Sequence, residues 1–216
     1  ELEQVFLPIQ IGHLTLPNRI LMGPVITGFE KSYDYDQLAR FYGERARGGT
    51  ALITIGGFSF TLLGAYELGQ ARFTSQSQVA SHRKITEAIQ KEGGYALFSL
   101  SHAGALAEHF LAVNPHQINH NGRLIFRMPS FAIRKTIHSA AHTALLAKQA
   151  LYNGVEIDLT QNKLLNSFAT PGLNKRHDEW GGSAENRFKI TLEMVREIRK
   201  KVGEDFIISA RLSLMD

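Results

Sequence analysis

Four histidines are the first residues in the sequence whose type and spacing could do chemistry. They lie in a stretch that also contains Asn and Pro: His102, His109, His116 and His120. Imidazole nitrogens bind zinc and other transition metals, so such a group raises the question of a metal site. The stretch has the character of a loop, and the His-Ala-Gly sequence at 102–104 falls where the chain must leave a strand. We therefore expect structural roles for these histidines and no metal.

Cysteine is absent, and so are the glycine-rich motifs that hold phosphate groups. Without cysteine the chain cannot form a disulfide framework, a thiolate zinc site or an iron–sulfur cluster from its own residues. It contains neither Gly-x-Gly-x-x-Gly nor a Walker sequence, which argues against a tightly held dinucleotide or nucleoside triphosphate. A chain without cysteine fits a reducing compartment, and we expect a cytoplasmic protein.

The composition is that of a globular protein. Hydrophobic residues make up 44% of the 216 residues and charged residues 20%, which favours a packed core over disorder or a coiled coil. No apolar run approaches the ~18 residues that cross a bilayer, so we expect no membrane partner. The net charge is +4, and the densest basic run is 199–201. This run is expected to complement a helix dipole, with nucleic-acid binding as the minor alternative.

Five short apolar segments indicate the strands that must position any site. Most are continuous apolar runs with β-branched residues, which is typical of parallel strands buried on both faces. They are residues 19–22, 50–55, 95–100, 154–157 and 206–210.

Segments with helical periodicity separate these strands, at 36–48, 81–93, 137–153 and 183–202. Strands that alternate with helices predict βαβ units and a parallel sheet. The spacing of about 30 to 55 residues between strands suits a β/α barrel with long loops at one rim, and a doubly wound sheet is the alternative architecture.

The two ends of the sequence suggest further features. Residues 8–17 alternate between apolar and polar around Gly12-His13, which predicts a β-hairpin that plugs the N-terminal end of a barrel. The sequence starts with Glu1 and stops shortly after the last expected strand. We expect that both ends have been cut.

Several segments of the chain occur in the order and spacing of a known family. They are residues 6–12, 16–20, 45–49, 101–104 and 174–187. Together they resemble the Old Yellow Enzyme family of FMN-dependent NAD(P)H:flavin oxidoreductases. The last segment, which reads Asn-Lys-Arg-His-Asp-Glu-Trp-Gly-Gly-Ser and continues to Glu-Asn-Arg, is the most specific match, and we expect its role to be structural.

The resemblance implies an eight-stranded TIM barrel, (β/α)8, that binds FMN at its C-terminal rim and uses NADH or NADPH as a transient electron donor. The chain supplies about five βα units and the hairpin. We expect residues 1–216 to be one FMN-binding domain that is truncated, because the family holds the flavin phosphate after its seventh and eighth strands. The implied partner is a small-molecule substrate, without nucleic acid or membrane, and a homo-oligomer remains open.

The resemblance assigns several residues to the cofactor. Pro24 and its neighbour Val25 follow the first strand, where the family backs the flavin. Ile26 replaces a Thr or Cys and can donate only through its backbone. Gly57 lies where a small residue lets the flavin ring approach the backbone. Ser99 replaces a glutamine and would reach the pyrimidine edge only through water.

Arg211 matches the family arginine at the end of the fifth strand. In the family that residue lies beside N1 and O2 of the flavin, where a permanent cation stabilises the negative charge of the reduced ring. A structural ion pair is the alternative role for Arg211.

The fourth strand departs furthest from the family. The resemblance places the substrate site at Asp158, Gln161 and Lys163, where relatives have a His-x-x-His or His-x-x-Asn donor pair followed by an aromatic proton donor. An ionised Asp accepts hydrogen bonds and cannot donate one. Either a protonated Asp158 or the charge of Lys163 would have to replace the lost donors.

Three functions compete at this stage. The leading hypothesis is a flavin-dependent oxidoreductase that passes hydride from NAD(P)H to an unsaturated or other small organic acceptor. The second is a catalytically degenerate barrel that serves as a binding or scaffolding module. The third is a lyase or aldolase with Lys163 as a Schiff-base amine, which fold analogy alone supports weakly.

Overall fold

The computed structural model describes residues 2–213. Five parallel strands form one sheet in the order β10-β9-β5-β4-β3. Their bounds are β3 Leu21–Met22, β4 Leu52–Ile55, β5 Tyr95–Leu100, β9 Gly154–Leu159 and β10 Ile207–Leu212. Spatial order therefore follows chain order without a reversal. A doubly wound sheet reverses direction at a switch point, so this order identifies an arc of a β/α barrel.

The two edge strands of the sheet approach each other at their carboxyl ends. Gly23 directly follows β3, and a Cβ on it would lie 3.1 Å from the guanidinium of Arg211 on β10. This contact requires the sheet to curve, so that its concave face encloses a space between the first and fifth strands.

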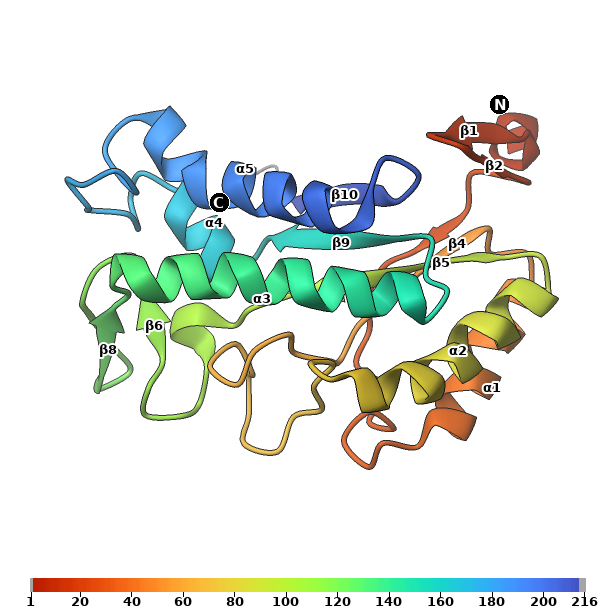
Figure 1. The fold of residues 1–216 in the computed structure, drawn as a ribbon, viewed down its shortest axis with the longest axis horizontal. Coiled ribbons are helices and arrows are strands. Elements are labelled where there is room, and N and C mark those ends of the chain that lie inside the picture. The colour runs from red at the N-terminus through yellow and green to blue at the C-terminus, as the bar shows by residue number, and fades with distance from the viewer. Residues whose placement is uncertain (1, 214–216) are drawn as a thin grey trace.

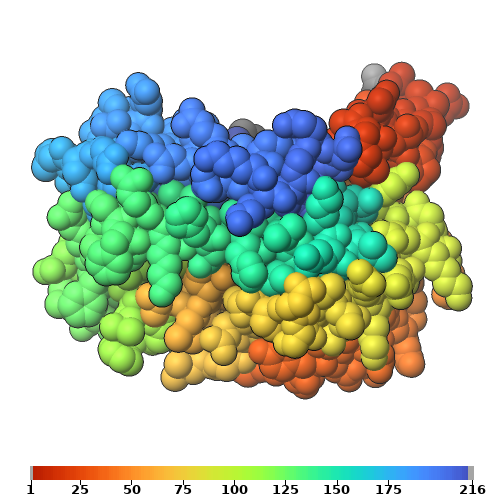
Figure 2. Space-filling view, viewed as in Figure 1, coloured from red at the N-terminus to blue at the C-terminus, as the bar shows by residue number. Residues whose placement is uncertain are grey.

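The helices cover the other face of the sheet. They are α1 Tyr35–Arg47, α2 Val79–Lys91, α3 Ser130–Gln149, the short α4 Leu164–Ala169 and α5 Ala184–Val202, with 3-10 turns η1 Leu2–Phe6, η2 Gln76–Gln78 and η3 Gly104–Leu106. Figure 1 shows α5, α3 and α2 side by side in front of the strands. The space-filling view has the same layers, with the N-terminal hairpin projecting at one corner (Figure 2).

Local sequence explains where these helices begin and end. The Asp34 side chain accepts a hydrogen bond from the Gln37 amide, and Ser183 does the same for Asn186, so both residues cap helix N-termini. At the end of α5, Arg199 donates to the carbonyls of Gly203, Glu204 and Phe206. The basic run 199–201 therefore ends a helix, as expected.

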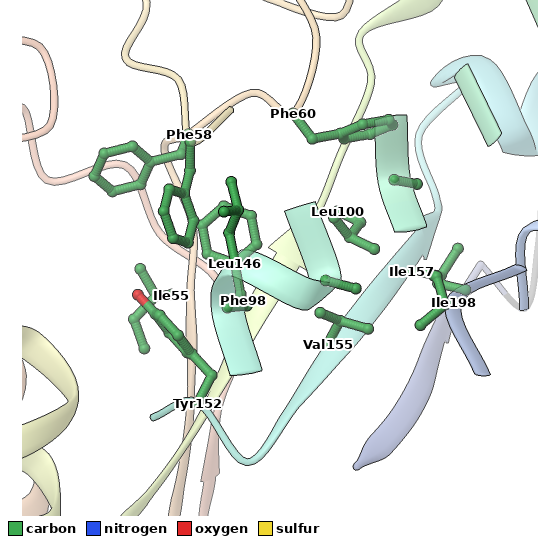
Figure 3. Packing of buried hydrophobic residues seen from close by; sticks show 14 of the residues in the cluster. Ile55, Phe58, Phe60, Phe98, Leu100, Leu146, Tyr152, Val155, Ile157 and Ile198 are labelled. Atoms are coloured by element: carbon green, nitrogen blue, oxygen red, sulfur yellow. The ribbon is translucent and has the colours of Figure 1, made fainter. Parts of the chain in front are cut away.

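The main core lies between the sheet and the helices. Figure 3 shows Phe98, Val155 and Ile157 of the sheet in one cluster with Leu146 of α3 and Ile198 of α5. Side chains alternate along a strand, so the residues between these point to the concave face. That alternation places polar groups at 99, 156 and 158 inside the arc.

The N-terminal hairpin closes the bottom of the arc, as the sequence predicts. Strands β1 Ile9–Ile11 and β2 Leu14–Leu16 pair in antiparallel fashion. Leu16 packs with Ala51, Leu52 and Leu97 at the amino ends of the barrel strands. The concave space is therefore apolar below and polar above.

Three elements differ from the sequence expectation. Helix α3 starts at Ser130 rather than near 137, directly after Pro129, which occupies its N-cap position. A small sheet of β6 Val113–Asn114, β7 Ile118–His120 and β8 Arg123–Arg127 fills the expected loop, and α4 follows β9.

Within residues 2–213 no three His, Cys, Asp or Glu side chains are placed to hold a metal.

The segment 174–187 braces the loops above the sheet. The Asn174 amide donates to the carbonyls of Phe168 and Trp180, both at 2.8 Å. The buried Arg176 guanidinium donates to the carbonyls of Pro115 and Met128 at 2.8 and 2.7 Å. These bonds connect the segment to α4, through Phe168, and to the residues that directly follow β6 and β8. No helix between residues 2 and 213 is long and apolar enough to cross a membrane.

Candidate active site

A cavity of about 400 Å³ lies at the carboxyl ends of the five strands. Its volume falls in the range of about 300 to 1,000 Å³ typical of ligand sites, and its position is where barrel enzymes carry their active sites. All nine residues that the sequence assigns to the cofactor and substrate line it: Pro24, Val25, Ile26, Gly57, Ser99, Asp158, Gln161, Lys163 and Arg211.

Arg211 supplies the cation on one side of the cavity. It pairs in register with Asp158 on β9, and its guanidinium reaches across to Gly23. Within residues 2–213 it makes no salt bridge of 4 Å or less, so its donors face the cavity rather than a protein carboxylate. Burial raises the pKa of the nearby Glu156, and the charge of Arg211 opposes that rise.

The opposite wall consists of backbone. A Cβ on Gly56 would lie 2.9 Å from both Pro24 and the Val25 carbonyl, so the ends of β3 and β4 approach too closely for a side chain there. Gly57 has φ +81°, and a Cβ on it would lie 2.6 Å from the carboxyl group of Glu30. These close contacts within the protein are enough to explain why both positions are glycine. A role for Gly57 toward a flavin stays a prediction.

Glu30 fixes the loop that carries Pro24–Ile26. Its buried carboxylate accepts hydrogen bonds from the Thr27 amide and hydroxyl and from the Gly28 amide, at 2.9 to 3.1 Å. The loop is thereby folded so that Ile26 is 72% exposed beside the cavity.

Ser99 lies on β5, deep in the cavity and in register with Glu156. The hydroxyl of Ser101, which also lines the cavity, and Oε1 of the neighbouring Glu156 are buried without a hydrogen bond within the described chain. The second oxygen of Glu156 accepts from Thr54 at 3.4 Å. The floor of the cavity therefore contains polar groups that the protein itself does not satisfy.

A tight turn separates the three residues expected at the substrate site. Gln161 and Asn162 both have φ of 56°, in the left-handed region, and the Lys163 amide donates to the Thr160 carbonyl at 3.1 Å. This turn exposes Gln161 and returns Lys163 to the interior. Asp158 is buried and Gln161 is exposed, and a joint role of the two residues toward a substrate stays a prediction.

Asp158 instead pairs with Lys163. The Lys163 ammonium contacts Oδ2 of Asp158, and Oδ1 accepts a hydrogen bond from the Thr160 hydroxyl at 2.6 Å. Each carboxylate oxygen therefore already has one protein donor. Asp158 and Lys163 both line the cavity, so the ion pair forms part of its wall.

Sequence reasoning missed several polar residues in or beside the site, among them Glu156 and Tyr66. Glu156 has the same orientation as Asp158 by strand alternation, and that signal could have identified it. Tyr66 comes from the loop after β4 and lines the cavity beside Ser101. Lys163 Nζ lies 5.8 Å from the centre of the Tyr66 ring. No local pattern indicates this position for Tyr66, because the fold of a long loop decides it.

The model of the NADH:flavin oxidoreductase / NADH oxidase family matches residues 4–216. The chain belongs to this family. Among curated relatives, it is 35% identical to a metal reductase of Desulforamulus reducens over 217 residues, which cover 97% of this chain and 32% of that protein. It is 30% identical to an NADH oxidase of Thermoanaerobacter brockii, covering 94% of this chain and 33% of that protein.

Solved structures of the family have the same fold. A 2-naphthoyl-CoA reductase superposes with a TM-score of 0.87 at 25% identity, over 98% of this chain and 35% of that one. The Old Yellow Enzyme homologue of Zymomonas mobilis gives 0.86 at 23%, over 96% and 63%. The partial TIM barrel expected from the sequence is thus confirmed. The chain spans about a third of the length of the first curated relatives.

The family's cofactors are FMN and a nicotinamide. The lining of the cavity includes donors that suit the ring of a flavin: the guanidinium of Arg211, the hydroxyl of Ser99 and the backbone amides of Val25 and Ile26. Hydrogen bonds and charge near the ring nitrogens are the means by which a protein tunes a bound flavin.

Proposed function

We propose that residues 1–216 belong to one FMN-binding barrel domain of an oxidoreductase that takes hydride from NADH or NADPH and passes it to an unsaturated or other small organic acceptor. The observation that carries this proposal is the convergence of all nine sequence-assigned residues on one cavity at the strand ends. FMN, when bound, supplies the two-electron chemistry that links donor and acceptor.

Arg211 is the residue that we assign to the polar edge of the flavin. Its guanidinium lines the cavity close to Gly23 and makes no salt bridge within residues 2–213. A fixed cation there stabilises the negative charge that a reduced flavin carries, which raises its reduction potential. Ser99 and the backbone of Pro24, Val25 and Ile26 would complete the contacts, with Gly57 beside them.

Lys163 is the residue that we assign to the oxygen of the acceptor. An ammonium donates hydrogen bonds and attracts a developing oxyanion, which are the two tasks of the donor pair that this chain lacks. Asp158 positions it, because the carboxylate is itself held by Thr160. Gln161 lies on the exposed side of the turn and would contact only a larger acceptor.

The ion pair also bears on the competing functions. A protonated lysine beside a carboxylate is not the free amine that a Schiff base requires, which weakens the lyase hypothesis. The second candidate is the catalytically degenerate barrel, and the observation in its favour is that Asp158, Thr160 and Lys163 satisfy one another. As part of the same proposal we place the protein in the cytoplasm, since the chain has no cysteine.

The test uses the complete protein. We expect it to purify yellow, to lose its colour with NADH or NADPH under anaerobic conditions, and to regain it with an unsaturated acceptor. A protein that binds FMN but is not reduced by either nicotinamide would favour the degenerate barrel. A protein that does not bind added FMN would contradict the proposal altogether.

A further inference from the structure

Tyr66 places a phenol in the cavity from a segment almost a hundred residues away from the ion pair. It lies in the loop between β4 and η2 and is half-buried. Its amide donates to the Gln70 side chain at 2.6 Å, and its carbonyl accepts from the Glu108 amide at 2.7 Å. The backbone of Tyr66 is thus held by its own loop and by the chain that follows η3, which fixes where the phenol lies.

The environment of this phenol is that of a proton donor. The Lys163 ammonium lies 5.8 Å from the ring centre, and Ser101 lines the same wall. Burial raises the pKa of the phenol above its usual value, while Lys163 opposes that rise. The phenol therefore stays protonated at neutral pH, and a cation is at hand to stabilise the phenolate left after proton transfer.

The lysine, the arginine and the serines of the cavity are less suited to this task. Lys163 is paired with Asp158, so a proton lost from it would leave a buried carboxylate without its counter-ion. The guanidinium of Arg211 does not deprotonate in proteins, and the hydroxyls of Ser99 and Ser101 are much weaker acids than a phenol.

We propose that Tyr66 is the proton donor to the acceptor in the reaction under "Proposed function", on which this inference rests. For an unsaturated carbonyl acceptor, the hydride forms a C–H bond at the carbon remote from the carbonyl. The π pair of the C=C bond forms a second C–H bond with the Tyr66 proton at the carbon next to the carbonyl. The acceptor gains two electrons, the flavin loses two, and the Tyr66 phenolate takes a proton back from water.

The experiment compares Tyr66→Phe with wild type in the complete, FMN-loaded protein. Tyr95→Phe is the matched control, because Tyr95 lies at the amino end of β5, at the opposite end of the barrel. Flavin reoxidation is followed with the most reactive of a set of unsaturated carbonyl compounds and with ferricyanide, which accepts electrons without protonation of carbon. We expect Tyr66→Phe to slow reoxidation by the carbonyl compound about 100-fold and to leave the ferricyanide rate and the FMN content within about twofold.

Two further readouts separate a proton donor from a structural residue. Wild type in deuterium oxide should place deuterium on one face of the carbon next to the carbonyl, and Tyr66→Phe should lose that selectivity. In the unreacted protein, the difference in ultraviolet absorbance between wild type and Tyr66→Phe reports the titration of the Tyr66 phenol. This titration should shift to higher pH when both proteins also carry Lys163→Met.

The outcomes are distinct. Equal slowing with both acceptors, or no slowing with either, overturns the assignment of Tyr66, as does retained facial selectivity. Absence of flavin reduction by nicotinamide in wild type overturns the proposed function itself, and this inference with it. A wild type that is reduced by nicotinamide but reduces none of the unsaturated carbonyl compounds overturns the inference alone.

Discussion

The ammonium of Lys163 and the carboxylate of Asp158 form an ion pair that is almost fully removed from solvent. The two side chains are 10% and 1% exposed, and the left-handed turn at 161–162 brings them together from positions five residues apart. Burying two charges is costly, and their attraction offsets that cost only while both are present. The pair therefore makes each residue dependent on the other for stability as well as for the proposed chemistry.

Asp158→Asn should destabilise the complete protein by about 3 to 5 kcal/mol, because it leaves the Lys163 ammonium buried without a counter-ion. Asp36→Asn is the matched control, since its pair with Lys84 is 79% and 54% exposed and is expected to contribute at most about 1 kcal/mol. Urea unfolding measures both. Adding Lys163→Met to Asp158→Asn should recover much of the loss, and an unrecovered loss would mean that the ion pair is not its cause.

Arg211→Ala should weaken FMN binding about 10- to 100-fold, the range for one charge-assisted hydrogen bond, and lower the flavin reduction potential. The cation beside the ring is lost, so the reduced flavin loses more stabilisation than the oxidised form. Fluorescence titration with FMN and spectroelectrochemistry measure the two quantities. Arg211→Lys keeps the charge and should retain most of the potential. If Arg211→Ala leaves both quantities unchanged, Arg211 does not face the flavin.

Gln161→Gly should stabilise the protein by about 0.5 to 1 kcal/mol, because glycine adopts the left-handed conformation without the steric cost that glutamine has there. Glu87→Gly provides the contrast: this exposed position lies within α2, where glycine should destabilise by about 1 kcal/mol. Thermal unfolding of the complete protein compares them. A loss of stability in Gln161→Gly would show that the glutamine side chain supports the turn more than its backbone strains it.

Stability should fall in acid partly because of His82. Burial lowers its pKa to about 3, below the value of about 6.5 in the unfolded chain, so the unfolded state binds the proton first. The contribution of the neutral imidazole to the free energy of unfolding is therefore complete above pH ~6.5 and is lost as the pH falls toward 3. His82 stacks on Phe73 with ring centres 3.7 Å apart, and its Nδ1 lies 2.9 Å from the Tyr152 hydroxyl.

Urea midpoints measured from about pH 7 to pH 4 test this dependence. His82→Phe removes the titrating group while keeping an aromatic ring against Phe73, and it should flatten the fall in stability. His138→Phe, at an exposed position of α3, should not. An equally steep fall in His82→Phe would assign the acid sensitivity to other groups, among them His102, whose pKa burial also lowers to about 3.

Local sequence determined the elements and their order. Continuous apolar runs with β-branched residues marked the strands, and Tyr95–Leu100 agrees with the observed β5 at both ends. Capping serines and aspartates marked helix starts such as that of α5. These features depend on interactions between residues that are close in the sequence, so they do not require knowledge of the rest of the fold. Family-specific segments then located the cavity residues, because those residues lie at the ends of recognisable strands.

Tertiary structure alone decided which of these residues meet. The sequence placed Asp158, Gln161 and Lys163 in one site, and all three line the cavity, but only the structure shows that the left-handed residues 161 and 162 bring Lys163 onto Asp158. The cavity also takes Tyr66 from a long loop and brings Arg211 to Gly23 across the arc. Such contacts depend on the curvature of the sheet and on how long loops close over it. The periodicity of apolar residues predicts neither the curvature of the sheet nor the path of a long loop, because both result from packing between segments that are distant in the chain.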